Sequence, residues 1–246
     1  MKILNTIVVN LLLVLMPSSS FGCAVIVQSP TSVLPHNKLQ EPPERGIPDG
    51  RKPFGTRGPC ETSDRPFTPL LPLPNPEFSG NTLTERPTFW FYIPYSANRV
   101  HSGQFVLADA TGNLFYGTNF TLPATPGFVS LKLPDSAPAL SPNQPYRWEI
   151  TLYCATETNR ESDDLVSHTG WITRISNPNL VTQLSTVSSE ERIKLYSDQH
   201  LWYDAANDFN QVTPASPDGI AVLQLLGLEL LKDEAIAGPV TLLADN

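Results

Sequence analysis

The stretch from Leu140 to Cys154 constrains the fold more than any other part of this sequence. From Tyr146 onward, apolar side chains occupy every second position, and charged or polar side chains stand between them, with Tyr153 as the one exception. A period of two over such a length is typical of a β-strand that buries one face. The side chains expected to point into the core are Tyr146, Trp148, Ile150, Leu152 and Cys154.

Further strand patterns lie on both sides of this stretch and predict a β-sandwich domain over residues 67–176. Residues 87–95 are apolar on both faces and have a proline near each end, as expected for a strand covered from two sides. Two other strand patterns flank the loop 109–113, in which Gly112 can adopt a positive φ. With an edge strand near residues 67–71 there are about seven strands, which predicts an immunoglobulin-like or fibronectin-like antiparallel sandwich.

The crossover before the patterned strand has a recognisable spacing. Leu140, Pro142 and Tyr146 stand as they do in the tyrosine corner of fibronectin type III domains, where the tyrosine hydroxyl bonds to upstream backbone. The alternative is an ordinary loop before a strand. The regularity of the strand that follows favours the corner.

After residue 176 the pattern becomes helical, and we predict a small helical C-terminal module over residues 177–246. Ser188 and Glu191 have the spacing of a capping box. Ser216 followed by Pro217 is typical of a second helix start. The chain as a whole is therefore predicted to be an α+β protein.

The N-terminal region indicates export. Residues 1–23 combine one lysine, a short apolar run and small residues, which predicts a secretory signal peptide. A retained anchor is the alternative, although the run is shorter than the about 20 apolar residues of a spanning helix. Cys23 ends a partial lipoprotein box and is a candidate for lipidation. Residues 24–66 form a proline-rich linker, with too few aromatic residues to fold alone.

Cys60 and Cys154 are the two cysteines that follow the predicted signal peptide and Cys23. In an oxidising compartment such a pair predicts a disulfide, with two free buried thiols as the alternative. Their separation excludes a short-spaced zinc motif. Closing so long a loop would stabilise the fold by about 3–4 kcal/mol in the chain-entropy model. The expected location is extracytoplasmic: periplasmic, secreted or on the outer surface, with a possible lipid anchor.

Charge and motifs narrow the function classes. The net charge of −8 argues against a nucleic-acid partner, because a phosphate backbone requires a basic face. The sequence has no nucleophile elbow, zinc-protease motif or dinucleotide loop, so we assign no catalytic residue, no metal ligand and no cofactor. His200 and Asp204 are four residues apart on a predicted helix and suit a metal or base–orienter pair, but no third ligand has a matching spacing. Asp109, Asp163 and Asp164 are loop acids that suit calcium binding, but no Asp-x-Asp-x-Asp sequence is present.

Aromatic side chains are the remaining candidates for binding. Most of them are expected in the sandwich core. Tyr95 and Tyr153 are expected to be exposed, where flat rings bind sugars or peptides, and His101 lies in a predicted loop. We take Tyr95, Tyr153 and His101 as the candidate ligand or partner surface. The predicted sandwich aromatics are Phe89, Trp90, Phe91, Tyr92, Tyr95, Trp148 and Trp171.

From about Gly55 to Leu231 the chain resembles a family of cyanobacterial exported proteins named only as domain of unknown function 928. The resemblance implies an exported domain with no established activity and no catalytic residues. His200 stands where a glycine is expected, which puts the turn between two helices in question. The resemblance rests on the segments Gly55–Cys60, Pro87–Tyr95, Pro126–Pro134, Tyr146–Cys154, Gly170–Arg174 and Leu201–Ala205.

Three functions are consistent with these features. The leading hypothesis is a non-enzymatic, exported protein that acts in envelope interaction or assembly, with an envelope protein or a glycan as its partner and no membrane span after signal removal. The alternative is a carbohydrate-binding module that uses Tyr95 or Tyr153. The third is a hydrolase with an unrecognised site around His101, His168 or His200.

Overall fold

The computed structural model describes residues 60, 63–73, 75, 77–154 and 165–243, except the side chain of His101. The predicted signal peptide, Cys23 and nearly all of the predicted linker lie outside these residues. The strands are β1 (Thr68–Pro69), β2 (Ser79–Thr82), β3 (Thr88–Ile93), β4 (Val100–Asp109), β5 (Leu114–Thr121), β6 (Gly127–Lys132), β7 (Pro145–Cys154), β8 (Leu165–Arg174), β9 (Ile236–Pro239) and β10 (Thr241–Leu242). The helices are α1 (Pro178–Thr186), α2 (Ser189–Gln199), α3 (Trp202–Asn207) and α4 (Pro217–Leu226), with 3₁₀ turns η1 (Asp208–Asn210) and η2 (Glu229–Leu231).

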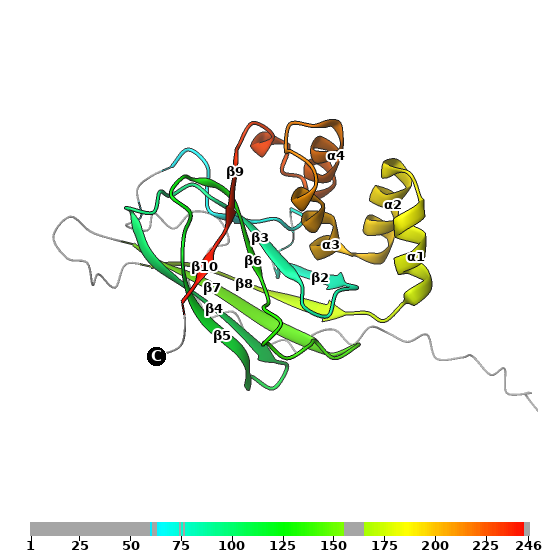
Figure 1. The fold of residues 1–246 in the computed structure, drawn as a ribbon, viewed down its shortest axis with the longest axis horizontal. Coiled ribbons are helices and arrows are strands. Elements are labelled where there is room, and N and C mark those ends of the chain that lie inside the picture. Colours follow the sequence, from blue (N-terminus) through cyan, green and yellow to red (C-terminus); the bar gives the residue numbers. More distant parts are fainter. Residues whose placement is uncertain (1–59, 61–62, 74, 76, 155–164, 244–246) are drawn as a thin grey trace, which may run out of the picture. The chain divides into compact units, whose positions relative to one another are not determined.

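The strands form two packed sheets, and the four short helices lie between β8 and β9 in the sequence (Figure 1). One sheet has the order β1-β3-β6-β9 and the other has the order β10-β5-β4-β7-β8-β2. The predicted α+β class and sandwich arrangement are confirmed at this level. Both sheets are mixed rather than antiparallel, because β2 pairs in parallel with β8 and β9 pairs in parallel with β6. Immunoglobulin-like connectivity stays a prediction.

Strand β7 lies between β4 and β8 and has the face predicted from its alternation. All five side chains expected to point inward are buried, and Trp148 has no exposed surface. On the other face Arg147 is exposed and Glu149 is half-buried. The six-stranded sheet therefore buries one face against the core and leaves the other face without a second described layer.

The four-stranded sheet is covered on both faces. One face of β3 contributes Phe89 and Phe91 to the core between the sheets. The other face contributes Trp90 and Tyr92 to a second core, which is formed with α3, η1 and α4. This double burial explains why β3 is apolar at consecutive positions, as its sequence predicted. The residues of the second core include Phe128, Ala206, Phe209, Val222, Leu223 and Leu226.

The predicted tyrosine corner forms. The hydroxyl of Tyr146 accepts a hydrogen bond from the backbone N–H of Ser141 at 3.1 Å. Leu140, at the start of the corner, has no exposed surface. The crossover into β7 is thus fixed by a polar contact at one end and by an apolar contact at the other.

The helix starts also follow their sequence signals. Ser188 and Glu191 form both hydrogen bonds of a capping box at α2. The side chain of Ser216 caps α4 by accepting from the N–H of Gly219. At the end of α2, His200 adopts a left-handed conformation with φ 54°, the geometry for which glycine is favoured.

The end of the chain differs from the predicted helical module over residues 177–246. The helical segment ends at η2, after which β9 pairs with β6 and β10 pairs with β5. Gly238 and Pro239 are poor helix formers, so this segment is better suited to extended pairing at sheet edges. The segment that contains β9 and β10 therefore pairs with both sheets. Within the described ranges, no helix is both long enough and apolar enough to cross a membrane.

Candidate functional site

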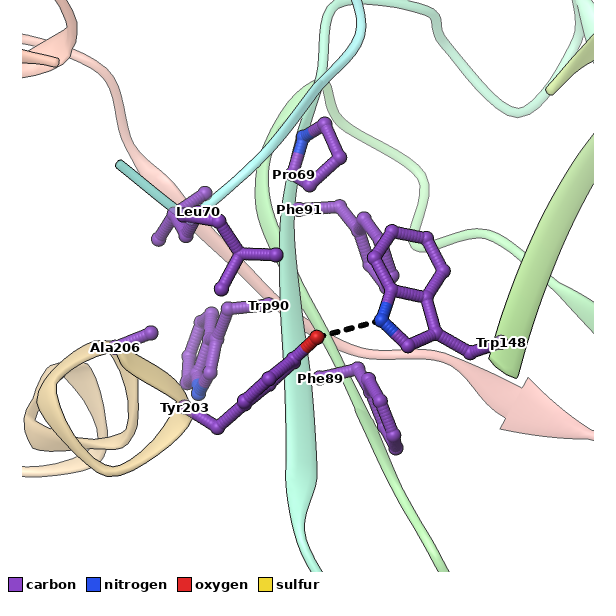
Figure 2. A pocket seen from close by; sticks show the side chains of 9 residues that line it. Pro69, Leu70, Phe89, Trp90, Phe91, Trp148, Tyr203 and Ala206 are labelled. Atoms are coloured by element: carbon purple, nitrogen blue, oxygen red, sulfur yellow. Dashed lines mark hydrogen bonds between the residues drawn. The ribbon is translucent and has the colours of Figure 1, made fainter. Parts of the chain in front are cut away.

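Helix α3 is joined to the sandwich by a buried hydrogen-bonded group (Figure 2). The indole N–H of Trp148 donates to the hydroxyl of Tyr203 at 2.6 Å. That hydroxyl in turn donates to the backbone carbonyl of Trp171 at 2.9 Å, and the carbonyl of Phe78 lies 3.3 Å away. Burial raises the pKa of Tyr203 well above its usual range, so the hydroxyl keeps its proton. We call Phe78, Trp148, Trp171 and Tyr203 the α3 joint.

The α3 joint is packed and encloses no ligand space. The space bordered by its rings and the neighbouring apolar side chains has no volume for a water molecule. Trp148 lines it from β7, Tyr203 and Ala206 line it from α3, and Phe89 and Phe91 line it from β3 (Figure 2). The joint therefore positions parts of the molecule and does not receive a small molecule.

Asp204, next to Tyr203, ties α3 to the segment after β2. Its carboxylate accepts from the backbone N–H of Leu83 at 3.1 Å and from the hydroxyl of Thr84 at 3.3 Å. Burial is the largest cause that raises its pKa from 3.8 to about 6. His200, a candidate partner for Asp204, stacks its ring on Trp202, with ring centroids 5.6 Å apart. Asp204 thus has a structural role in the described geometry.

His168 is a half-buried titratable group whose side chain points into the fold. Its Nε2 lies 2.8 Å from the backbone carbonyl of Phe67, to which the neutral ring donates. The rings of Phe67 and Phe78 lie at centroid distances of 4.7 and 5.6 Å. Burial lowers the pKa of His168, which keeps the imidazole neutral. This histidine fills core space and satisfies a carbonyl at the edge of β1.

The predicted disulfide is present. The structure joins Cys60 to Cys154 at the end of β7, with 5.3 Å between their Cα atoms and a sequence separation of 94. Both residues are buried. The bond ties the segment before β1 to the six-stranded sheet.

The three residues predicted as a partner surface lie at the disulfide end of the sandwich. The prediction that His101 lies in a loop was wrong: it is part of β4, at a shift in the register between β4 and β7 next to the pairing of Ser102 with Tyr153. Tyr95 lies in the loop that leads into β4, half-buried against the core, and burial raises its pKa. Tyr153 is half-buried on the face of β7 that points away from the core. The structure therefore separates Tyr95 from the open sheet face to which Tyr153 belongs.

The side of the six-stranded sheet that points away from the core carries a mixture of polar, charged, aromatic and apolar side chains. Strand alternation and register define it, and we call it the outer face of the six-stranded sheet. Its charged side chains, Arg147 and Glu149, lie 3.8 Å apart. Trp171 pairs with Arg147 across β7 and β8 and is half-buried. The outer face comprises Ser102, Gln104, Val106, Ala108, Leu114, Gly117, Asn119, Arg147, Glu149, Thr151, Tyr153, Leu165, Ser167, Thr169, Trp171 and Thr173, of which Thr151 is buried.

Sequence reasoning placed Trp171 among the sandwich aromatics and did not recognise it as a surface residue. The sequence contained the information for this assignment. Ile172 is apolar and continues the positions of β8 whose side chains point into the core. Alternation then puts Trp171 on the opposite side. Ile172 has no exposed surface, in agreement with this assignment.

A further opening is a groove of about 350 Å³, which lies between residues 213–215 and 232–236. Its acid Glu234 is paired with Arg65 at 3.2 Å. In the part of the chain that the structure describes, no three His, Cys, Asp or Glu side chains gather as a metal site.

No curated protein and no solved structure matches this chain. One family model matches residues 52–235, a range that contains the α3 joint and the outer face and ends directly before β9. Because that match covers well over half of the sequence, the chain belongs to the family described as Domain of Unknown Function (DUF928).

Proposed function

We propose that this protein is a non-enzymatic interaction protein of an extracytoplasmic compartment, and that it binds an envelope component through the outer face. The proposal is based on the outer face, which is one side of a six-stranded sheet whose strands pair in regular register. In the described part of the chain, no helix or second sheet forms a layer over this side. The cyanobacterial origin implied by the sequence resemblance is part of the same proposal.

Two further observations support it. The disulfide between Cys60 and Cys154 suits an oxidising compartment, in keeping with the predicted signal peptide. The half-buried titratable groups His168 and Asp204 form hydrogen bonds to backbone and hydroxyl groups within the fold, His168 through Nε2 and Asp204 through its carboxylate. Such groups stabilise a scaffold, and a scaffold with an open polar face is suited to binding.

The test is photo-crosslinking in intact cells that export the protein. A photoreactive amino acid replaces Thr169 on the outer face, and the matched control replaces Thr182, which is exposed on α1. We expect a crosslinked envelope component, identified by mass spectrometry as peptide or glycan, at Thr169 and not at Thr182. Equal crosslinking at both positions, or none at Thr169, contradicts the proposal.

A further inference from the structure

We infer that the disulfide between Cys60 and Cys154 is a redox-sensitive latch on residues 232–243, which we call the C-terminal segment. While the disulfide is intact, it holds Arg65 against Glu234, and this contact keeps the C-terminal segment paired with both sheets. When the disulfide is reduced, the segment opens. The latch is a property of the fold itself and does not depend on the proposed function.

The contact at the centre of the latch joins two distant parts of the chain. Nε of Arg65 lies 3.2 Å from a carboxylate oxygen of Glu234, and the two side chains are 36% and 26% exposed. Nη1 of Arg65 is buried without a hydrogen-bond partner. Among the residues that the structure describes, the guanidinium therefore depends on Glu234 for compensation of its charge, and loss of this contact leaves a partly buried cation unpaired.

Glu234 also interacts with the four-stranded sheet. The pKa of Tyr92 on β3 is raised to about 12, first by burial and then by the charge of Glu234 and a side-chain hydrogen bond to it. The phenol therefore keeps its proton and donates it to the carboxylate. Glu234 is thus held by a strand of the sheet and by Arg65, shortly before the chain enters β9.

The C-terminal segment is paired with the two sheets over short stretches. β9 pairs with β6 at three positions, with a register shift among them, and β10 pairs with β5 at two positions. The backbone N–H of Val240 donates to the carbonyl of Ser130 at 2.9 Å. The N–H of Leu243 donates to the carbonyl of Asn119 at 2.8 Å. Such short pairings open at a low free-energy cost, so one additional contact at their start changes how often they open.

Arg65 lies between two anchors of the chain. On one side is Cys60, which is bonded to the end of β7, and Arg65 follows five residues after it. On the other side is Phe67, whose buried ring packs on His168 with centroids 4.7 Å apart. Reduction of the disulfide removes the first of these anchors. The chain at Arg65 then gains conformational freedom, which lowers the population of its contact with Glu234.

Opening of the C-terminal segment alters the groove of about 350 Å³. Residues 232–236 line one side of this groove, and residues 213–215 line the other. The redox state of the disulfide therefore decides whether the groove is complete. In the reduction step, a dithiol reductant gives two electrons and two protons to the bond between the cysteines; two thiols form, and the reductant becomes a disulfide.

The experiment is amide hydrogen exchange of the purified full chain, followed residue by residue by NMR, before and after reduction with dithiothreitol. The reporters are the amides of Val240 and Leu243. The internal control is the amide of Ala205, which donates to the carbonyl of Leu201 at the start of α3. We expect reduction and Arg65→Ala each to raise the exchange rates of both reporters about two- to fivefold relative to that of Ala205.

Combining the two perturbations distinguishes a latch from two unrelated contacts. In the Arg65→Ala variant, reduction should give no further increase at the reporters relative to Ala205, because the contact through which it acts is already lost. Glu234→Gln should have the same effect as Arg65→Ala and replaces it if that variant folds poorly. The matched control is Lys194→Ala, which breaks the exposed ion pair with Asp198 on α2 and should leave the reporters unchanged.

Two results overturn the inference. The first is reduction that leaves the exchange rates of Val240 and Leu243 unchanged relative to Ala205. The second is an undiminished effect of reduction in the Arg65→Ala or Glu234→Gln background, which would show that the disulfide acts on the C-terminal segment by another route or on the whole fold.

Discussion

Replacing Tyr203 by Phe removes a single hydroxyl from the α3 joint and leaves the ring in place. The ring packs on Phe89, with centroids 5.5 Å apart, and this contact is retained in the variant. What is lost is the acceptor for the indole N–H of Trp148 and the donor to the carbonyl of Trp171. The variant therefore isolates the polar part of the contact between helix and sandwich.

The structure sets the size of the effect. Trp148 has no exposed surface, so its N–H cannot exchange the lost partner for water. A buried donor left unpaired costs about 1–3 kcal/mol. The carbonyl of Trp171 adds a smaller cost, because under-satisfied carbonyls are better tolerated than orphaned N–H groups. We expect Tyr203→Phe to lower the free energy of unfolding by about 2–3 kcal/mol, a large part of the about 5–15 kcal/mol of a typical domain.

Urea unfolding followed by tryptophan fluorescence measures this change. With a dependence of about 1–3 kcal/mol per molar urea, the midpoint should fall by about 1 M. Tyr116→Phe makes the same chemical change at a half-buried position and should shift the midpoint by less than about 0.3 M. If the Tyr203 and Tyr116 variants unfold at the same urea concentration, the argument from the buried indole is refuted.

Three further variants test other parts of the fold. Because burial holds the pKa of Asp204 at about 6 instead of 3.8, the folded state retains a proton that the unfolded state releases. This proton stabilises the folded state below about pH 4, and the stabilisation is lost as pH rises through 6. In urea unfolding, the free energy of unfolding of the unmodified protein should therefore fall by at most about 3 kcal/mol between pH 4 and 7.5, and Asp204→Asn should abolish that fall. His200→Gly should raise the melting temperature, with a gain of about 1 kcal/mol from the relieved left-handed residue, whereas His200→Ala should not. Replacing Cys60 and Cys154 by serine should lower the free energy of unfolding by about 3–4 kcal/mol, and peptide mapping without reduction should show the two wild-type peptides linked.

The sequence predicted those structural features that depend on residues close to one another in the chain. The alternation of β7 predicted its buried face, and the capping box at Ser188 predicted the start of α2. The tyrosine corner was also predictable, since Leu140 and Tyr146 are close in sequence and act on one crossover. Each of these features depends on residues within a few positions of one another, so the sequence contains the whole cause.

Edge strands depend on distant partners, and the sequence did not reveal them. Strand β2, with the sequence Ser-Gly-Asn-Thr, has no apolar alternation and is held by its parallel pairing with β8 and by α3. Added side chains would collide there, since a Cβ on Gly80 would lie 2.7 Å from the ring of Trp202. Strand β9 contains Gly238 and Pro239 and is likewise extended because β6 offers a free edge. Both sheets are mixed because β2 and β9 each pair in parallel with a neighbouring strand.

The division of the helices between the two sheets explains where a binding surface can lie. The described helices bury their apolar sides on β3 and around β2, so the four-stranded sheet must be apolar on both faces. The six-stranded sheet buries one face in the core between the sheets, and its other face carries polar and charged side chains such as Arg147 and Glu149. Substitutions on such a surface usually change stability by less than about 0.5 kcal/mol. Loss of binding in Trp171→Ala with an unchanged melting temperature would therefore locate function on this face, whereas a joint loss of binding and stability would show that the indole serves the scaffold.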